Sequence, residues 1–291
     1  MMAYTRLVDE EFLWGALYNP VVSNSGSEEA MRLVIFGSTN AGVLVIKSLL
    51  EYQSRFPKQI SIVGVATDDP ADPQTKISVK KRIWKYYNQE DMVVLRDKVI
   101  EAAIGGGLPC YTGSVKTDKF REIFRKWNPD ALIMCCFGQK IDPFLFNFPR
   151  FGMYNFHPSD LASKIGEGSQ PFHDTINNGK TTSVMTIHLV NEWIDRGPIV
   201  GFSSKINILK DDGNYPVNIL SLQEKIPSVC GWLSIELVLE ILKQRGKGIS
   251  GPVTEINFDE LTPVYIRQKL LEPANDDLSD NYTLPLHDLI Q

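Results

Sequence analysis

The sequence lacks the features that mark membrane, secreted and disulfide-stabilised proteins. None of its apolar runs approaches the roughly 18 residues that a membrane-spanning helix needs. The four cysteines have no CxxC spacing and include the adjacent pair Cys135 and Cys136, so we interpret them as small buried side chains in a reducing compartment. The N-terminal segment is acidic where a secretory signal would be basic. These absences predict a cytoplasmic protein that does not associate with membranes.

The sequence also lacks an excess of basic residues. Its 291 residues carry a formal net charge of −5, whereas a dedicated nucleic-acid binder usually carries a broad excess of Lys and Arg. Hydrophobic residues make up 43% of the chain, which is enough for the core of one large domain or two modest ones. We therefore expect a globular protein, and the charge disfavours a nucleic-acid partner, although it is compatible with a local basic patch.

The first thirty residues differ from those that follow. The segment 8–20 contains enough apolar residues for a short helix, and 22–30 has the composition of a polar linker. We expect residues 1–30 to be an N-terminal extension, 31–205 to be a catalytic domain, and 206–291 to be a C-terminal region of helical and extended segments.

After this extension, buried strands alternate with segments of helical length. The runs 31–37, 60–68 and 131–138 are almost wholly apolar, as in strands that are covered on both faces. A helix is expected to begin after Thr117, because apolar residues recur at helical spacing as far as Trp127. This alternation predicts an α/β fold with a doubly wound, mostly parallel, Rossmann-like sheet.

The pattern changes after residue 200. A long amphipathic helical stretch covers 218–244, and Pro227 marks a turn or kink within it. The second part of this stretch has an apolar face that could pack on the core or on a second subunit in a homodimer. This face consists of Val229, Leu233, Leu237 and Ile241.

Polar clusters follow three of the predicted strands. In open α/β sheets, ligands bind beyond the carboxyl ends of the strands, where the strand order reverses. The clusters at 37–42, 137–140 and 155–160 are therefore candidate binding segments. The first resembles a Gly-rich loop but lacks both GxGxxG and the P-loop lysine, so it is equally consistent with an ordinary turn.

Three polar side chains have the chemistry that acyl transfer to a nitrogen requires. Asn155 and His157 lie at the end of one predicted strand, and Asp195 lies in the turn after another, 183–190. A carboxylate can orient and charge an imidazole and receive a proton from an attacking amine, while amide and imidazole N–H groups stabilise an oxyanion. A histidine after a strand is nevertheless often structural, so these residues alone leave both interpretations open.

A metal site is a weaker alternative. His157, His173 and His188 lack the spacing that places two metal ligands on one face of an element. We expect no metal ion, and we expect His188 to point into the fold.

The motifs at these positions resemble those of the 10-formyltetrahydrofolate-dependent formyltransferases. This family includes methionyl-tRNA, glycinamide ribonucleotide and sugar-nucleotide N-formyltransferases. The resemblance covers about residues 31–205 and implies the formyltransferase fold. It is carried by NFHPS at 155–159, VMTIH at 184–188 and DRGP at 195–198, and also by the segments 31–42 and 128–141.

The resemblance implies roles for particular residues. Asn155, His157 and Asp195 would be the catalytic trio. The donor, 10-formyltetrahydrofolate, would bind with its pterin enclosed by two turns, which contain Cys136, Phe137, Gly138, Ile141, Val190, Glu192 and Ile194. Residues on the acceptor side would be Ser38, Asn40, Ser159 and Glu167.

One loop departs from the family pattern. If Gly168 aligns with the family glycine, the segment 159–172 is two residues longer than usual, and Glu167 stands where the family commonly has an arginine. This loop borders the amine acceptor in the family, so a reversed charge there leaves the identity of the acceptor open.

We therefore predict an N-formyltransferase that acts on the amine of a small molecule, with a nucleotide-linked amino sugar as the acceptor left by elimination. Methionyl-tRNA formyltransferases carry a C-terminal barrel with a basic face, whereas the first half of the residues after Gly201 looks helical and the chain is acidic. Glycinamide ribonucleotide enzymes have a first loop richer in glycine. The alternatives are a methionyl-tRNA formyltransferase-like enzyme, a formyltetrahydrofolate hydrolase, and an inactive folate or nucleotide binder.

Overall fold

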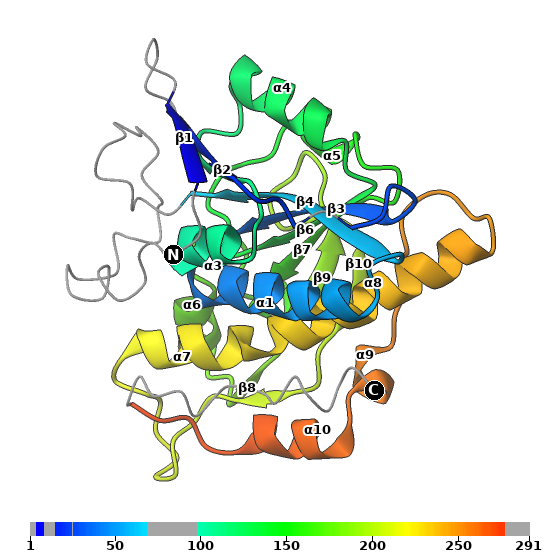
Figure 1. The fold of residues 1–291 in the computed structure, drawn as a ribbon. Coiled ribbons are helices and arrows are strands. Elements are labelled where there is room, and N and C mark those ends of the chain that lie inside the picture. Colours follow the sequence, from blue (N-terminus) through cyan, green and yellow to red (C-terminus); the bar gives the residue numbers. More distant parts are fainter. Residues whose placement is uncertain (1–3, 9–14, 25, 69–97, 277–291) are drawn as a thin grey trace.

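A nine-stranded sheet forms the centre of the computed structural model, which describes residues 4–8, 15–24, 26–68 and 98–276 (Figure 1). From β3 in the middle of the sheet, the chain winds outward through β4 and β5, then returns to β6 beside β3 and winds outward through β7, so the strand order reverses between β3 and β6. This arrangement confirms the predicted doubly wound α/β fold. The parallel strands are, in spatial order, β5 (Cys110–Gly113), β4 (Ile60–Thr67), β3 (Met31–Gly37), β6 (Ala131–Cys135) and β7 (Met153–His157).

Antiparallel strands extend this parallel centre at both edges. They are β1 (Tyr4–Val8) and β2 (Gly15–Pro20) beside β5, and β9 (Thr186–Leu189) and β10 (Ile199–Phe202) beside β7.

The prediction of a short helix over 8–20 is wrong for residues 15–20, which form a strand. Ala16 and Tyr18 are both buried, and this spacing of two residues is the period of a strand. Their strand, β2, pairs with β5 and therefore belongs to the same sheet as β3 to β7. The predicted domain boundaries after residues 30 and 205 stay predictions.

Helices cover both faces of the sheet (Figure 1). α1 (Thr39–Arg55), α3 (Lys98–Gly105) and α8 (Cys230–Gly246) pack against one face, and α4 (Asp118–Trp127) and α5 (Pro143–Phe146) pack against the other. The prediction for α4 is confirmed, because Thr117 caps its start by accepting a hydrogen bond from Phe120 N at 3.1 Å. Strands buried on both faces explain the apolar runs in the sequence.

The predicted helical stretch after residue 218 consists of α7 (Ile219–Lys225), a 3-10 turn η3 (Ile226–Val229) that contains Pro227, and α8. The interruption at Pro227 is confirmed. The apolar face that could have served a second subunit lies inside the chain, because its four side chains are at most 1% exposed. The smaller elements are η2 (Leu161–Ser163), α6 (Pro171–Asn177), β8 (Thr182–Ser183), β11 (Ile206–Asn207), α9 (Phe258–Leu261) and α10 (Val264–Leu271).

No helix in the part of the chain that the structure describes is long and apolar enough to cross a membrane.

Candidate active site

The alternation of side chains along β7 places Asn155 and His157 on one face of the sheet. Tyr154 and Phe156 point to the opposite face, where they join the core beneath α1 and α8. The neighbouring strand β9 runs antiparallel, and its register sets His188 directly opposite Asn155. Residues directly opposite each other in an antiparallel pair share a face, so three polar side chains from two strands lie together.

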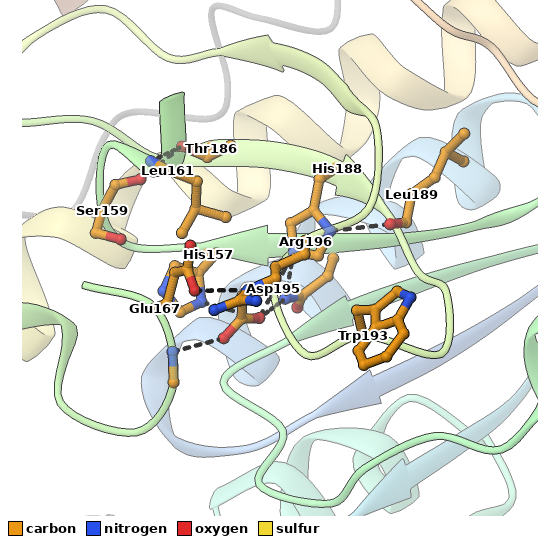
Figure 2. A network of polar contacts seen from close by, with 12 residues as sticks. His157, Ser159, Leu161, Glu167, Thr186, His188, Leu189, Trp193, Asp195 and Arg196 are labelled. Atoms are coloured by element: carbon orange, nitrogen blue, oxygen red, sulfur yellow. Dashed lines mark hydrogen bonds and ion pairs between the residues drawn. The ribbon is translucent and has the colours of Figure 1, made fainter. Parts of the chain in front are cut away.

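The loop after β9 folds back and adds Asp195 to this group. Its carboxylate lies beside His157 (Figure 2), with Oδ1 at 3.5 Å from His157 Nδ1. The same oxygen lies 3.3 Å from Asn155 Nδ2. Asp195 adopts a left-handed conformation with φ of 55°. The return also needs glycine at position 197, where a Cβ would lie 1.6 Å from the Leu189 carbonyl oxygen. The sequence-predicted trio therefore meets in space because the Asp-Arg-Gly-Pro turn is tight.

The Asp195 carboxylate is held as an anion. Burial opposes its ionisation, but the anion is stabilised by His188 and His157 when either imidazole is protonated and by the Gly168 N–H, so the pKa of Asp195 lies below its ordinary value. Gly168 N donates to Asp195 Oδ2 at 2.8 Å. This contact connects the loop 159–172, which differs from the family pattern, to the trio.

His157 faces two acceptors. Its Nε2 lies 2.6 Å from the Gly166 carbonyl oxygen, so Nε2 carries a proton that it donates there. Burial lowers the pKa of His157, and the Asp195 carboxylate only partly opposes this effect. A neutral His157 then presents an unprotonated Nδ1 to Asp195, and the gap between them can hold one proton. In this structure, the imidazole N–H expected at an oxyanion is bonded to the loop carbonyl instead.

His188 is buried, as expected, but it also faces the candidate site. It is 2% exposed, it lines the cavity described next, and its Nε2 lies 3.0 Å from Asn155 Nδ2. Its position follows from the register of β9 on β7, which the sequence does not reveal.

A cavity of about 570 Å³ opens beside the trio, beyond the carboxyl ends of β6 and β7. This is the edge of the sheet where α/β proteins bind ligands, and the volume is within the range of small-molecule sites. Among the predicted donor-binding residues, those that line it are Cys136, Phe137, Gly138, Ile141, Val190 and Ile194. The prediction missed other lining residues, which include Lys116, Lys140, Asn191, Trp193 and Gln223.

Five predicted residues lie outside the lining of this cavity as the described residues form it. Glu192 is exposed on the loop after β9. Ser38 is fully buried and hydrogen-bonds to Thr67 and to the Asp68 carboxylate. The buried Oδ1 of Asn40 has no partner among the described residues. The Oγ of Ser159 donates a hydrogen bond to the Gly166 carbonyl. Glu167 forms an ion pair with Arg196 Nε at 2.8 Å.

No group of three potential metal-ligating side chains occurs among the described residues.

The buried His157 and Asp195 predict a loss of stability in acid. The folded state keeps the pKa of His157 below 6.5, so only the unfolded chain gains that proton as the pH falls below 6.5. Asp195 adds a second loss as the pH falls through 3.8 and below, because its folded-state pKa is also lowered. The free energy of unfolding should therefore fall with decreasing pH, by at most about 1.4 kcal/mol per pH unit for each group.

Denaturant unfolding between pH 8 and pH 5 measures this slope. His157→Gln should flatten it below pH 6.5, whatever the variant does to stability at pH 8. A variant whose slope matches that of the original protein would show that His157 is not the group responsible.

The fold and the buried acid–base cluster define an α/β enzyme with a ligand cavity at the carboxyl edge of its sheet. The sequence profile of the formyl transferase family matches residues 31–219, which is more than half of the chain. The chain therefore belongs to the formyl transferase family, whose members are folate-dependent transferases.

Relatives of known name agree with this assignment. The chain is 27% identical over 227 residues to a methionyl-tRNA formyltransferase of Dictyoglomus turgidum, an alignment that covers 77% of this chain and 62% of that protein. It is 29% identical over 200 residues to a methionyl-tRNA formyltransferase of Thermodesulfovibrio yellowstonii, which covers 66% of this chain and 61% of that protein. The chain thus spans less than two thirds of the length of these relatives.

Among solved structures, the fold is similar to glycinamide ribonucleotide transformylase 1 from Symbiobacterium toebii. The TM-score is 0.55 at 14% sequence identity, and the match covers 75% of this chain and 91% of that one. This likeness concerns the fold alone.

Proposed function

We propose that this chain is an N-formyltransferase that moves the formyl group of 10-formyltetrahydrofolate to the amine of a small molecule. The observation that carries the proposal is the meeting of Asn155, His157 and the Asp195 anion at one end of a cavity of about 570 Å³. An anionic base beside a histidine and an amide N–H is the set of groups that formyl transfer to nitrogen requires.

The cavity suits the proposed donor. Apolar side chains from two loops face it, Phe137 and Ile141 from one and Val190 and Ile194 from the other, and they could enclose a planar pterin. Trp193 is 63% exposed at the cavity and adds an aromatic surface (Figure 2). When bound, 10-formyltetrahydrofolate would supply a formyl group on its N10 atom.

The trio can move the protons that the reaction requires. A new bond forms between the acceptor nitrogen and the formyl carbon, and the bond from that carbon to N10 breaks. The acceptor nitrogen loses one proton and N10 gains one. Asp195, already an anion, takes the proton, and His157 shares it through Nδ1 across the 3.5 Å gap. His157 then becomes a cation, which favours negative charge on the formyl oxygen, and the same proton passes to N10 as the bond from N10 to the formyl carbon breaks.

We infer that the acceptor is a small amine, with a nucleotide-linked amino sugar as the first candidate. Glu167 stands on the side of the site that would receive it, and its ion pair with Arg196 neutralises the charge reversal noted in the sequence. Methionyl-tRNA is the second candidate, because the curated relatives carry that name.

A panel of acceptors tests the proposal. The protein is incubated with 10-formyltetrahydrofolate and one acceptor at a time: nucleotide-linked amino sugars, glycinamide ribonucleotide or methionyl-tRNA. The products are identified by mass spectrometry. A formylated amino sugar would support the first candidate, and a formylated methionyl-tRNA would replace it with the second. The absence of any formylated product with every amine would refute transfer to nitrogen.

A further inference from the structure

We infer that His188 is a positioning residue that holds the side-chain amide of Asn155 with its nitrogen toward the reacting atoms. The inference rests on the proposed formyl transfer, but the geometry that carries it does not depend on the acceptor. His188 is buried at 2% exposure and lies opposite Asn155 in the register of two paired strands.

The partners of His188 fix its tautomer. Its Nδ1 lies 2.9 Å from the Leu189 carbonyl oxygen, which can only accept, so Nδ1 carries the proton. A neutral imidazole with a proton on Nδ1 has an unprotonated Nε2. That nitrogen lies 3.0 Å from Asn155 Nδ2 and therefore accepts an amide N–H, whereas Asp195 Oδ1 is 3.7 Å away, beyond hydrogen-bond distance. Because Leu189 is the next residue along β9, the strand itself sets this orientation.

The second Asn155 N–H faces Asp195 Oδ1 at 3.3 Å. This is the longer of the two contacts, and it is the N–H that can turn to the formyl oxygen when a substrate is bound. Its carboxylate partner weakens as an acceptor while Asp195 shares the proton of the amine with His157. At that moment, His188 is the group that still keeps the nitrogen of Asn155, rather than its oxygen, toward the developing negative charge.

An amide that rotates by 180° would present a carbonyl oxygen to the oxyanion and repel it. The role of His188 should therefore appear in turnover and not in binding of the donor. Gln can place a side-chain oxygen near the former Nε2, whereas Leu has a similar size and no acceptor. Asn carries its amide nearer to the position of Nδ1 and cannot reach Asn155.

The experiment compares His188→Gln, His188→Leu and His188→Asn, with Ser203→Ala as the control. Ser203 is another buried polar residue, on the segment after β10, and it accepts from Met185 N at 2.8 Å away from the cavity. We expect kcat to fall at least tenfold in the Leu and Asn variants and less than about threefold in the Gln and Ser203 variants. The dissociation constant of 10-formyltetrahydrofolate should change less than about twofold in all four.

Two results would overturn the inference. One is a Leu or Asn variant with unchanged kcat, or a Gln variant that recovers none of it; if the Leu variant does not fold, the comparison of Gln with Asn decides. The other is a ¹⁵N NMR spectrum of the original protein in which His188 carries its proton on Nε2. The spectrum needs no acceptor, so it judges the orientation of Asn155 even if no amine is formylated and the proposed function fails.

Discussion

Replacing Asp195 with Asn is expected to reduce formyl transfer by about 10²- to 10⁴-fold, the range that a positioned general base contributes. The substitution removes the anion that receives the proton of the amine. It also removes the carboxylate that lies 3.5 Å from His157 Nδ1, so His157 can no longer share a proton with a basic partner. The amine would then have to lose its proton to solvent from a buried site.

The fold should survive this change. The Asn side chain has nearly the same shape and can still accept the hydrogen bond from Gly168 N through its oxygen. Asp160→Asn is the matched control, because Asp160 caps the η2 turn on the same loop and lies outside the cavity lining. Circular dichroism and donor binding should match the original protein in both variants. Near-normal turnover by the Asp195 variant would refute the proposed role of the carboxylate.

Replacing Asn155 with Leu is expected to lower kcat by about 10²- to 10³-fold, the usual effect of losing one donor to an oxyanion. Leu keeps the approximate shape of Asn but has no N–H for the formyl oxygen. It also leaves His188 Nε2 without the hydrogen bond that it accepts at 3.0 Å. The donor should still bind, because the loops that enclose the cavity are unchanged.

Steady-state kinetics with saturating donor measures this effect. Asn178→Ala is a suitable control, since Asn178 bonds to the Asp174 carbonyl on the surface and does not line the cavity. The double variant that combines Asn155→Leu with Asp195→Asn should have a kcat only slightly lower than that of the single variants, because residues that act together do not contribute additively. A loss confined to KM would contradict an oxyanion role for Asn155.

The sequence revealed the main architecture because its strongest patterns are local. The apolar runs of β3, β4 and β6 and the helical spacing of α4 were readable, since covered strands and amphipathic helices leave distinct periods. The sequence does not distinguish the strand β2 from part of a helix, because a short segment with several apolar residues fits either period until its burial is known.

Only part of the candidate site can be predicted from the sequence. Asn155 and His157 stand two residues apart on one strand, and Asp195 lies in a recognisable turn. The contact of His188 with Asn155 is not predictable from the sequence, because it depends on the pairing register of two strands that are separated by a loop and a helix. Ser38 is predicted as a binding residue, but its hydroxyl donates a hydrogen bond to the carboxylate of Asp68, thirty positions away in the chain. Contacts of this kind are tertiary, and no local pattern encodes them.

The release of tetrahydrofolate from 10-formyltetrahydrofolate, followed with and without an amine acceptor, tests the central claim most directly. The claim is that Asn155, His157 and Asp195 carry out formyl transfer to nitrogen. It predicts rapid release in the presence of a suitable amine, negligible release without one, and loss of the amine-dependent rate in Asp195→Asn. Equal release with and without amines would identify a hydrolase instead, and no release under any condition would identify a binding protein; either result would contradict the claim.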